Sequence, residues 1–393
     1  MKGEYYYRDY ADRSRPQKSR RSLWGILLDL LVGVISVVTI LAAVLTFLAP
    51  FVNPGRAWIF SILGLIAPAV YLATVIAALY WIIRWRWGWA SVLLVLVVIG
   101  LWRVPLFLKP ELRRTYGEPA YGRGTIGVMT YNVRGFYDEQ GRNSADSVLR
   151  MIRETGPDIV CLQEFNGRLA GDRALLEAVL PGYGCAAGAP DPRAEETGSA
   201  SALLICSRYP IIRSGDVVGK SGYERHGRSI WADLRIGDDT VRVFNNHLHS
   251  TAIKADDNAF ITEHRFLSDT ASDERIRSIV RRFRDNSILR AAQADTIARA
   301  VAASPYPQIV CGDFNDTPMS YVYRRMAGGL RDAFSVAGKG FSHTYRGFFN
   351  TLRIDYVLYA DPPFEAIGYR VLTEIDYSDH HPVLVRLRKI AAG

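Results

Sequence analysis

The stretch Val310-Cys311-Gly312-Asp313-Phe314-Asn315-Asp316 joins an apolar run to a carboxylate and an amide, two residues apart. The β-branched and small apolar residues of 308–314 predict a buried strand. Asp313 and Asn315 would then lie where that strand ends. A single polar residue at such a place is usually a turn former or a solvated strand end. The stretch therefore indicates a functional site only if the same pattern, an apolar run beside a polar residue, occurs elsewhere in the chain.

The pattern recurs in five other parts of the chain. Polar residues lie at or beside predicted strands 126–133 (Asn132), 159–165 (Glu164), 241–249 (His247), 353–359 (Asp355) and 382–387 (Asp379, His380). Further strands are predicted at 202–207, 229–236 and 366–372, and helices at 143–155 and 273–303. Many short strands with few helices favour an α/β domain of two packed sheets, with these polar side chains on one rim.

These residue types suit hydrolysis of a phosphate ester. Oxygen ligands such as Asn132, Glu164 and Asp379 match the preference of Mg²⁺ or Mn²⁺. An Asp-Xaa-Asn unit supplies a base that orients water and an amide that contacts phosphate, and a His beside an Asp supplies a steered imidazole. Several carboxylates brought together also favour a compensating cation.

Seven stretches resemble the endonuclease/exonuclease/phosphatase superfamily, in that family's order, over about residues 125–389. They are TYNVRG (130–135), IVCLQE (159–164), LLICSRYPI (203–211), FNNHLHS (244–250), GDFNDTP (312–318), RIDYVLY (353–359) and SDHHPV (378–383). The resemblance implies a four-layer α/β sandwich, two packed β-sheets flanked by helices, with the site at one rim.

The resemblance also implies roles for single residues. Metal ligands fall on Asn132, Glu164 and Asp379, which would hold Mg²⁺ (or Mn²⁺). The base that orients water falls on Asp313 and the amide that contacts phosphate on Asn315. The catalytic imidazole falls on His380 and its orienting carboxylate on Asp355. His247 matches a histidine that contacts the phosphate or the leaving group in the nuclease and sphingomyelinase branches.

Other histidines and the cysteines favour structural roles. His249, His343 and His381 have no expected metal role, and no pair of residues has zinc-ligand spacing. Cys161, Cys206 and Cys311 fall inside predicted strands, as small buried hydrophobic residues do.

The N-terminal third has a different character. Residues 1–107 carry a net charge of +7 out of +9 for all 393 residues, so the high basicity does not indicate a nucleic-acid-binding catalytic domain. Apolar runs at 24–52, 58–83 and 88–102 predict about three transmembrane helices, since a bilayer core needs about 20 apolar residues. We therefore expect a basic cytoplasmic tail (1–22), a transmembrane region (23–107), a linker (108–124) and a catalytic domain (125–393).

The basic residues predict the orientation. Seven lie in the tail and two, Arg84 and Arg86, between the second and third runs, whereas Arg56 alone lies between the first and second. The positive-inside rule places the first two groups in the cytoplasm. Three crossings would make the chain a multi-pass protein of the cell inner membrane with an extracytoplasmic catalytic domain. If the third run does not cross the membrane, the catalytic domain would lie in the cytoplasm instead.

The sequence favours a membrane-anchored, metal-dependent phosphoesterase but leaves its substrate open. Nucleic acid and a phospholipid headgroup are both possible, as are a phosphodiester and a phosphomonoester; the oligomeric state is undecided. A catalytically silent scaffold is the alternative, and the intact set of polar residues argues against it. A transporter is disfavoured because Asp29 is the single acidic residue of the apolar region.

Overall fold

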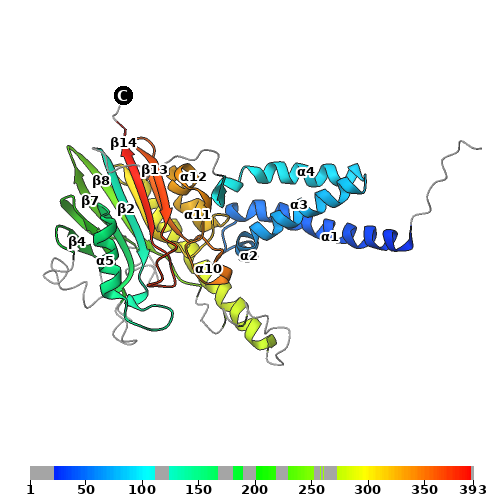
Figure 1. The fold of residues 1–393 in the computed structure, drawn as a ribbon, viewed down its shortest axis with the longest axis horizontal. Helices are drawn as coiled ribbons and strands as arrows, with labels where there is room; N and C mark the ends of the chain where they lie inside the picture. Colours follow the sequence, from blue (N-terminus) through cyan, green and yellow to red (C-terminus); the bar gives the residue numbers. More distant parts are fainter. Residues whose placement is uncertain are drawn as a thin grey trace, which may run out of the picture.

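Two six-stranded sheets packed face to face form the catalytic domain in the computed structural model (Figure 1). The structure describes residues 22–110, 124–166, 180–188, 201–217, 229–251, 257, 260 and 272–390. Alternate side chains of the strands meet between the sheets in an apolar core that includes Val128, Ile205, Val243 and Val385. Burial of this two-sided apolar surface is the main reason that the sandwich forms.

The first sheet has the order β13-β14-β2-β3-β5-β4, and only β2 and β3 run parallel to each other. Its strands are β2 (Thr125–Asn132), β3 (Ile159–Asn166), β4 (Gly184–Ala187), β5 (Ser201–Ser207), β13 (Phe364–Val371) and β14 (Val383–Lys389). A disulfide joins Cys185 of β4 to Cys206 of β5, which corrects the expectation that Cys206 is simply a buried hydrophobic residue. Cys161 and Cys311 are free and buried, as expected.

The second sheet has the order β10-β12-β9-β8-β7-β6, in which β8 and β9 are parallel. Its strands are β6 (Ile211–Asp216), β7 (Ser229–Ile236), β8 (Asp239–His247), β9 (Gln308–Asp313), β10 (Leu330–Asp332) and β12 (Asp355–Ala360). The edge strands β4, β6 and β10 were not predicted, because they are short and their burial is irregular. Two more residues, β1 (Leu108–Lys109), pair with β11 (Gly340–Phe341) at the start of the expected linker.

Helices cover the outer faces of both sheets and complete four layers. The first sheet is covered by α5 (Ala145–Thr155), whose apolar side includes Val148 and Ile152. The second is covered by α10 (Ser272–Ala302) and α11 (Tyr321–Met326), which pack on Phe244 and Val310. The short α12 (Ala333–Ala337) lies beside β12 and β13. The predicted α/β architecture, two packed mixed sheets flanked by helices, is thus confirmed.

The apolar N-terminal region forms helices that project away from the sandwich (Figure 1). They are α1 (Leu23–Leu48), α2 (Ile59–Leu65), α3 (Ala67–Ile83) and α4 (Trp87–Leu101). Among the described residues, one continuous helical segment, Leu23–Phe51, is long and apolar enough to cross a membrane. α2 and α3 reach that length only as a pair bent by 66° between them, and α4 has 15 residues.

The expectation of three transmembrane helices is therefore corrected to one candidate, or two if the bent pair is a single span. The second run is broken at Ile66, where α3 begins with Pro at its first turn. The basic tail lies outside the described residues. Asp29 of α1 accepts hydrogen bonds from Arg84 (2.7 and 2.8 Å) and from the Tyr80 hydroxyl (2.7 Å), so it joins α1 to the end of α3.

Candidate active site

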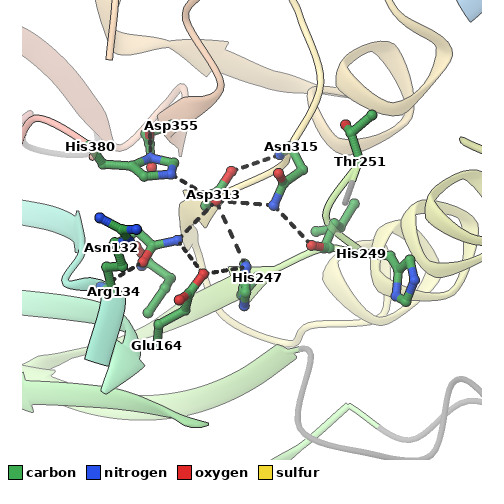
Figure 2. Close-up of polar contacts among 12 residues, drawn as sticks. Asn132, Arg134, Glu164, His247, His249, Thr251, Asp313, Asn315, Asp355 and His380 are labelled. Atoms are coloured by element: carbon green, nitrogen blue, oxygen red, sulfur yellow. Dashed lines mark hydrogen bonds and ion pairs between the residues drawn. The ribbon is translucent and has the colours of Figure 1, made fainter. Parts of the chain in front are cut away.

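Strand register places three of the expected site residues side by side. Asp313 ends β9, and its Cα partners are His247 on the parallel strand β8 and Asp355 on the antiparallel strand β12. Residues in register on neighbouring strands present their side chains to the same face of a sheet. The three groups therefore meet at one rim of the second sheet, as Figure 2 shows.

Gly312 is what allows β8 and β9 to approach so closely there. A Cβ at this position would lie 2.0 Å from the carbonyl oxygen of Asn246, and the residue has φ = +131°, which side chains rarely permit. Glycine is the residue that meets both demands. The glycine before Asp313 is thus part of how the sequence positions the site.

Asp355 and His380 form a buried pair at the site. The imidazole Nδ1 of His380 donates to Asp355 Oδ2 at 2.9 Å, and its Nε2 faces Asp313 Oδ2 at 3.7 Å. Burial lowers the pKa of His380, but Asp355, Asp313 and Asp379 together outweigh it and raise the pKa well above its usual range. The backbone N–H of Asp355 donates to Thr344 Oγ1 at 3.1 Å. The ring is therefore held as an imidazolium that points at Asp313.

The amide of Asn132 connects the two sheets. Its Nδ2 donates to Glu164 Oε1 and to Asp313 Oδ2, both at 3.1 Å, while its Oδ1 accepts from the backbone N–H of Arg134. His247 Nε2 lies 3.5 Å from Glu164 Oε1 and 3.8 Å from Asp313 Oδ2. The contacts bring residues of β2, β3, β8 and β9 into one polar cluster (Figure 2).

Asp313 is the centre of this cluster. Its side chain is 1% exposed, and burial raises its pKa to about 7; His380 opposes this shift, and Asp355 reinforces it. Asn315 donates to Asp313 twice, from its backbone N–H (2.8 Å) and its Nδ2 (3.0 Å). These bonds orient the carboxylate toward the pocket.

Two of the site residues have a backbone conformation that is rare outside glycine. Glu164 has φ = +52° and Asn315 has φ = +53°. Glu164 lies where the register of β3 with β5 shifts between Leu162 and Phe165. Such conformations cost of order 1–3 kcal/mol and concentrate at functional sites.

Asp379 lies apart from the buried cluster but faces the same pocket. Its Oδ2 lies 3.7 Å from Nε of Arg134, and its side chain is 28% exposed. It lines a pocket of about 140 Å³ with Glu164, Asp313, Asn315 and His380. The structure thus brings all eight expected residues to one rim: six in a network of contacts, Asp355 beneath His380, and Asp379 on the pocket wall.

The donor set fits a hard divalent cation. Asn132, Glu164 and Asp379 supply oxygen ligands beside Asp313, whose pKa is raised mainly by burial and further by Asp355. A second group, Asp313, Asp355 and His380, has ligand atoms within 4.8 Å of one another. In that group Asp355 already binds the imidazole at 2.9 Å. Glu164 and Asp379, whose side chains are 34% and 28% exposed, could hold a divalent cation.

Sequence reasoning missed several residues around the site. Tyr345 packs its ring 5.1 Å from that of His380, and burial raises the pKa of Tyr345 to about 12. Ser378 donates to the Asn132 carbonyl at 2.8 Å. Arg134 could have been found, because it follows Asn132 by two residues at a strand end. Tyr345 carries no local signal, since only tertiary contacts bring it to the site.

A family comparison agrees with this geometry. Residues 129–380, more than half of the chain, match the model of the Endonuclease/Exonuclease/phosphatase family. The chain belongs to this family. Residues 29–105 match a second model, described as a domain of unknown function. No curated protein matches the chain.

Three solved structures are similar to this chain at low sequence identity. The human Nocturnin catalytic domain with bound sulfate is 18% identical, with 68% of this chain and 94% of that chain covered and a TM-score of 0.48. The 3′ phosphatase NExo from Neisseria, bound to a product DNA hairpin, is 17% identical, with coverages of 66% and 98% and a TM-score of 0.47. A functionally unknown conserved protein from Enterococcus faecalis is 18% identical, with coverages of 67% and 100% and a TM-score of 0.47.

Proposed function

We propose that this protein is a membrane-anchored, divalent-metal-dependent phosphoesterase that hydrolyses a phosphodiester or a phosphomonoester. The observation that carries the proposal is the Asp355–His380 pair aimed at Asp313, with Asn315 and Glu164 on the same rim. Family membership supports the reaction class. A silent scaffold would have no need to keep so many carboxylates together, because their burial is costly.

In the proposed mechanism, each residue acts on the phosphate or on the attacking water. Asp313, as a carboxylate, orients a water molecule for attack on phosphorus and accepts its proton. The imidazolium of His380 and the amide of Asn315 stabilise the charge that develops on the phosphoryl oxygens. His247 contacts the phosphate or the leaving group. A divalent cation held by Asn132, Glu164 and Asp379 would supply Lewis-acid stabilisation of that charge.

Metal removal tests the reaction. EDTA should abolish hydrolysis of bis(4-nitrophenyl) phosphate or 4-nitrophenyl phosphate, and Mg²⁺ or Mn²⁺ should restore it. Glu164→Gln should weaken metal binding measured by calorimetry, whereas His380→Ala should lose turnover and still bind the metal. His343→Ala, which changes an imidazole outside the site, is the control. Turnover that persists in EDTA would contradict the proposal.

We further propose that the helices α1 to α4 anchor the protein in the cell inner membrane. Large apolar side chains are exposed along these helices, for example Leu30 (68%), Leu72 (62%) and Val98 (63%). Exposed apolar surface on this scale is typical of a lipid-facing or protein-facing region. The extent of exposure supports a membrane rather than an aqueous environment.

We propose that the catalytic domain lies on the extracytoplasmic side. With the basic tail in the cytoplasm, a single crossing by the continuous candidate span Leu23–Phe51 would place the domain outside, whereas a second crossing would return it to the cytoplasm. The Cys185–Cys206 disulfide favours the outer side, because disulfides persist in oxidising compartments. A reporter active only in one compartment, fused after residue 120, tests the side. Activity of a cytoplasmic reporter at that point would overturn the proposed orientation.

A further inference from the structure

Leu65, the last residue of α2, lies in the wall of the pocket that holds the proposed catalytic residues. The pocket of about 140 Å³ is lined by Leu65 together with Glu164, Asp313, Asn315 and His380. Leu65 belongs to the apolar N-terminal region, which the sequence separates from Asp313 by more than 200 residues. The proposed site is thus not built from the catalytic domain alone.

The contact between α2 and the site is close and specific. The Gly64 carbonyl accepts from Thr317 Oγ1 at 3.2 Å, and a Cβ at Gly64 would lie 2.6 Å from the Met319 carbonyl oxygen. Thr317 and Met319 are at most 3% exposed, and their loop begins at Asn315. The end of α2 therefore packs directly on the loop that carries a proposed phosphate ligand.

The pocket is lined by apolar as well as polar side chains. Apart from Leu65, its apolar lining consists of Phe283 of α10 and of Phe348, Leu352 and Ile354. The one arginine or lysine among its described lining residues is Arg290, which is 1% exposed. That guanidinium faces Asp316 at 3.5 Å and donates to the His249 carbonyl at 2.8 Å. A pocket of this composition suits a phosphate with an apolar substituent better than a polyanion.

The helix that supplies Phe283 also carries exposed basic side chains. The N-terminal part of α10 projects from the sandwich (Figure 1), with Arg277, Arg281 and Ile276 exposed. Arg284 pairs with Asp285 at 2.8 Å, and Asp273 and Glu274 lie in the first turn of the helix. Basic residues beside apolar ones favour contact with anionic lipid headgroups. The exposed Arg277 and Arg281 would therefore offer lipid phosphates a contact on the helix that supplies Phe283 to the pocket.

We infer that the substrate is a phosphate ester with an apolar tail that is presented by a lipid bilayer, and that Leu65 contacts this tail. The inference rests on the phosphoesterase function proposed above and adds the substrate class. The phosphate would lie against Asn315 and His380, and the tail would leave over Leu65 toward α2. Leu65 is then a specificity-determining residue supplied by the membrane region.

Equilibrium binding of phosphates with and without tails tests the inference. The full chain in lipid nanodiscs with Mg²⁺ is titrated with dihexanoylphosphatidic acid against glycerol 3-phosphate, and with dihexanoylphosphatidylglycerol against glycerophosphoglycerol. In at least one pair the tailed compound should bind roughly tenfold more tightly, the effect of burying about two methylene groups. Leu65→Gln should reduce this preference at least threefold, whereas Ile66→Gln, an exposed neighbour that does not line the pocket, should keep it.

The comparison of variants separates binding in the pocket from partition into lipid, because partition is the same for every variant. Leu65→Ala serves as a second variant if Leu65→Gln lowers the yield of folded protein. Equal binding with and without tails, a preference that Leu65→Gln leaves unchanged, or tighter binding of a short oligonucleotide would each overturn the inference. If the tail preference is present but neither nitrophenyl phosphate esters nor the tailed phosphates are hydrolysed, the proposed activity fails, and only the binding of the tail at Leu65 stands.

Discussion

At the residue scale, the arrangement around His380 depends on one carboxylate. Asp355→Asn keeps the shape of the side chain but removes the charge that holds the imidazolium, so we expect kcat to fall about 10²–10⁴-fold. The alkaline limb of the pH–rate profile should move to lower pH, because Asp355 is the largest of the charges that raise the pKa of His380. Steady-state kinetics with a nitrophenyl phosphate ester measure both effects.

Asp361→Asn is a matched control, because Asp361 pairs with Arg331 at the other end of β12 and is 38% exposed. It should change kcat less than about twofold. A loss of less than tenfold in Asp355→Asn, with an unchanged melting temperature, would contradict the proposed orienting role.

A second residue-scale prediction concerns the buried imidazoles behind the site. His381 is 3% exposed, donates from Nδ1 to the Ile375 carbonyl at 3.2 Å and packs edge-on against His343. Burial lowers the pKa of both histidines. Below an unfolded-state pKa of about 6.5 the unfolded chain therefore binds more protons, so their stabilisation is complete above that pH and is lost as the pH falls.

Urea unfolding at pH 7.5 and 6.0 measures this effect. Between pH 7.5 and 6.0, His381→Gln should lose less free energy of unfolding, or gain more, than the unsubstituted protein, because it lacks an imidazole that the fold holds neutral. His380 and Asp313, whose raised pKa values stabilise the fold as the pH falls, contribute equally to both proteins. Between pH 7.5 and 8.5, where both imidazoles are neutral, the two proteins should show the same slope. The same change in the free energy of unfolding in both proteins between pH 7.5 and 6.0 would exclude His381 as a source of the pH dependence.

At the scale of elements, Arg353 holds the end of the apolar region against the second sheet. Its guanidinium donates to both carboxylate oxygens of Asp332 (3.1 and 2.8 Å) and to the Leu106 carbonyl at 2.8 Å. The side chains of Arg353 and Asp332 are 1% and 4% exposed. Loss of the arginine would leave a buried carboxylate without its cation.

We therefore expect Arg353→Leu to lower the free energy of unfolding by about 3–5 kcal/mol. Arg331→Leu removes an exposed pair with Asp361 and should cost about 0–1 kcal/mol. Chemical unfolding followed by tryptophan fluorescence measures both. Equal effects of the two substitutions would show that the buried pair has no special role.

At the scale of the whole molecule, the sandwich has its own core. The apolar cluster between the sheets lies entirely within residues 126–387, whereas Leu106 only borders the cluster beneath α10 and α11. We expect residues 125–389 to fold as a soluble domain with a cooperative thermal transition. Loss of the contacts with Gly64 should expose Thr317 and Met319, so proteolysis in that loop should be faster than in the full chain. Persistent aggregation of several such fragments would contradict this expectation.

The strands that carry site residues were predictable because each is a buried apolar run with a polar side chain at or near one end. Asn132, Glu164, His247, Asp313 and Asp355 could be placed at strand ends in this way. The edge strands β4, β6 and β10 were not, because an edge strand buries little and shows no clear period. The disulfide was missed because the pairing of Cys185 with Cys206 depends on β4 and β5 being neighbours.

The membrane prediction shows the limit of counting apolar residues. The composition of 58–83 indicates one span, but the chain breaks at Ile66 and turns by 66°. Beside the proline in the first turn of α3, contacts distant in sequence lie near the break: Gly64 packs against the backbone at Met319, and Asn53, before the run, donates to Asp295 at 3.4 Å. The packing of α2 on the sandwich thus accompanies a break between α2 and α3 that the hydropathy of the sequence does not predict.

The sequence by itself determined the family, the class of fold and the residues of the proposed site, because periodicity and local motifs are properties of short segments. Only the tertiary structure decided which side chains surround that site. Strand register sets His247 and Asp355 beside Asp313, and the packing of α2 brings Leu65 into the pocket. Such contacts join residues far apart in the chain, and their positions follow from how whole elements pack.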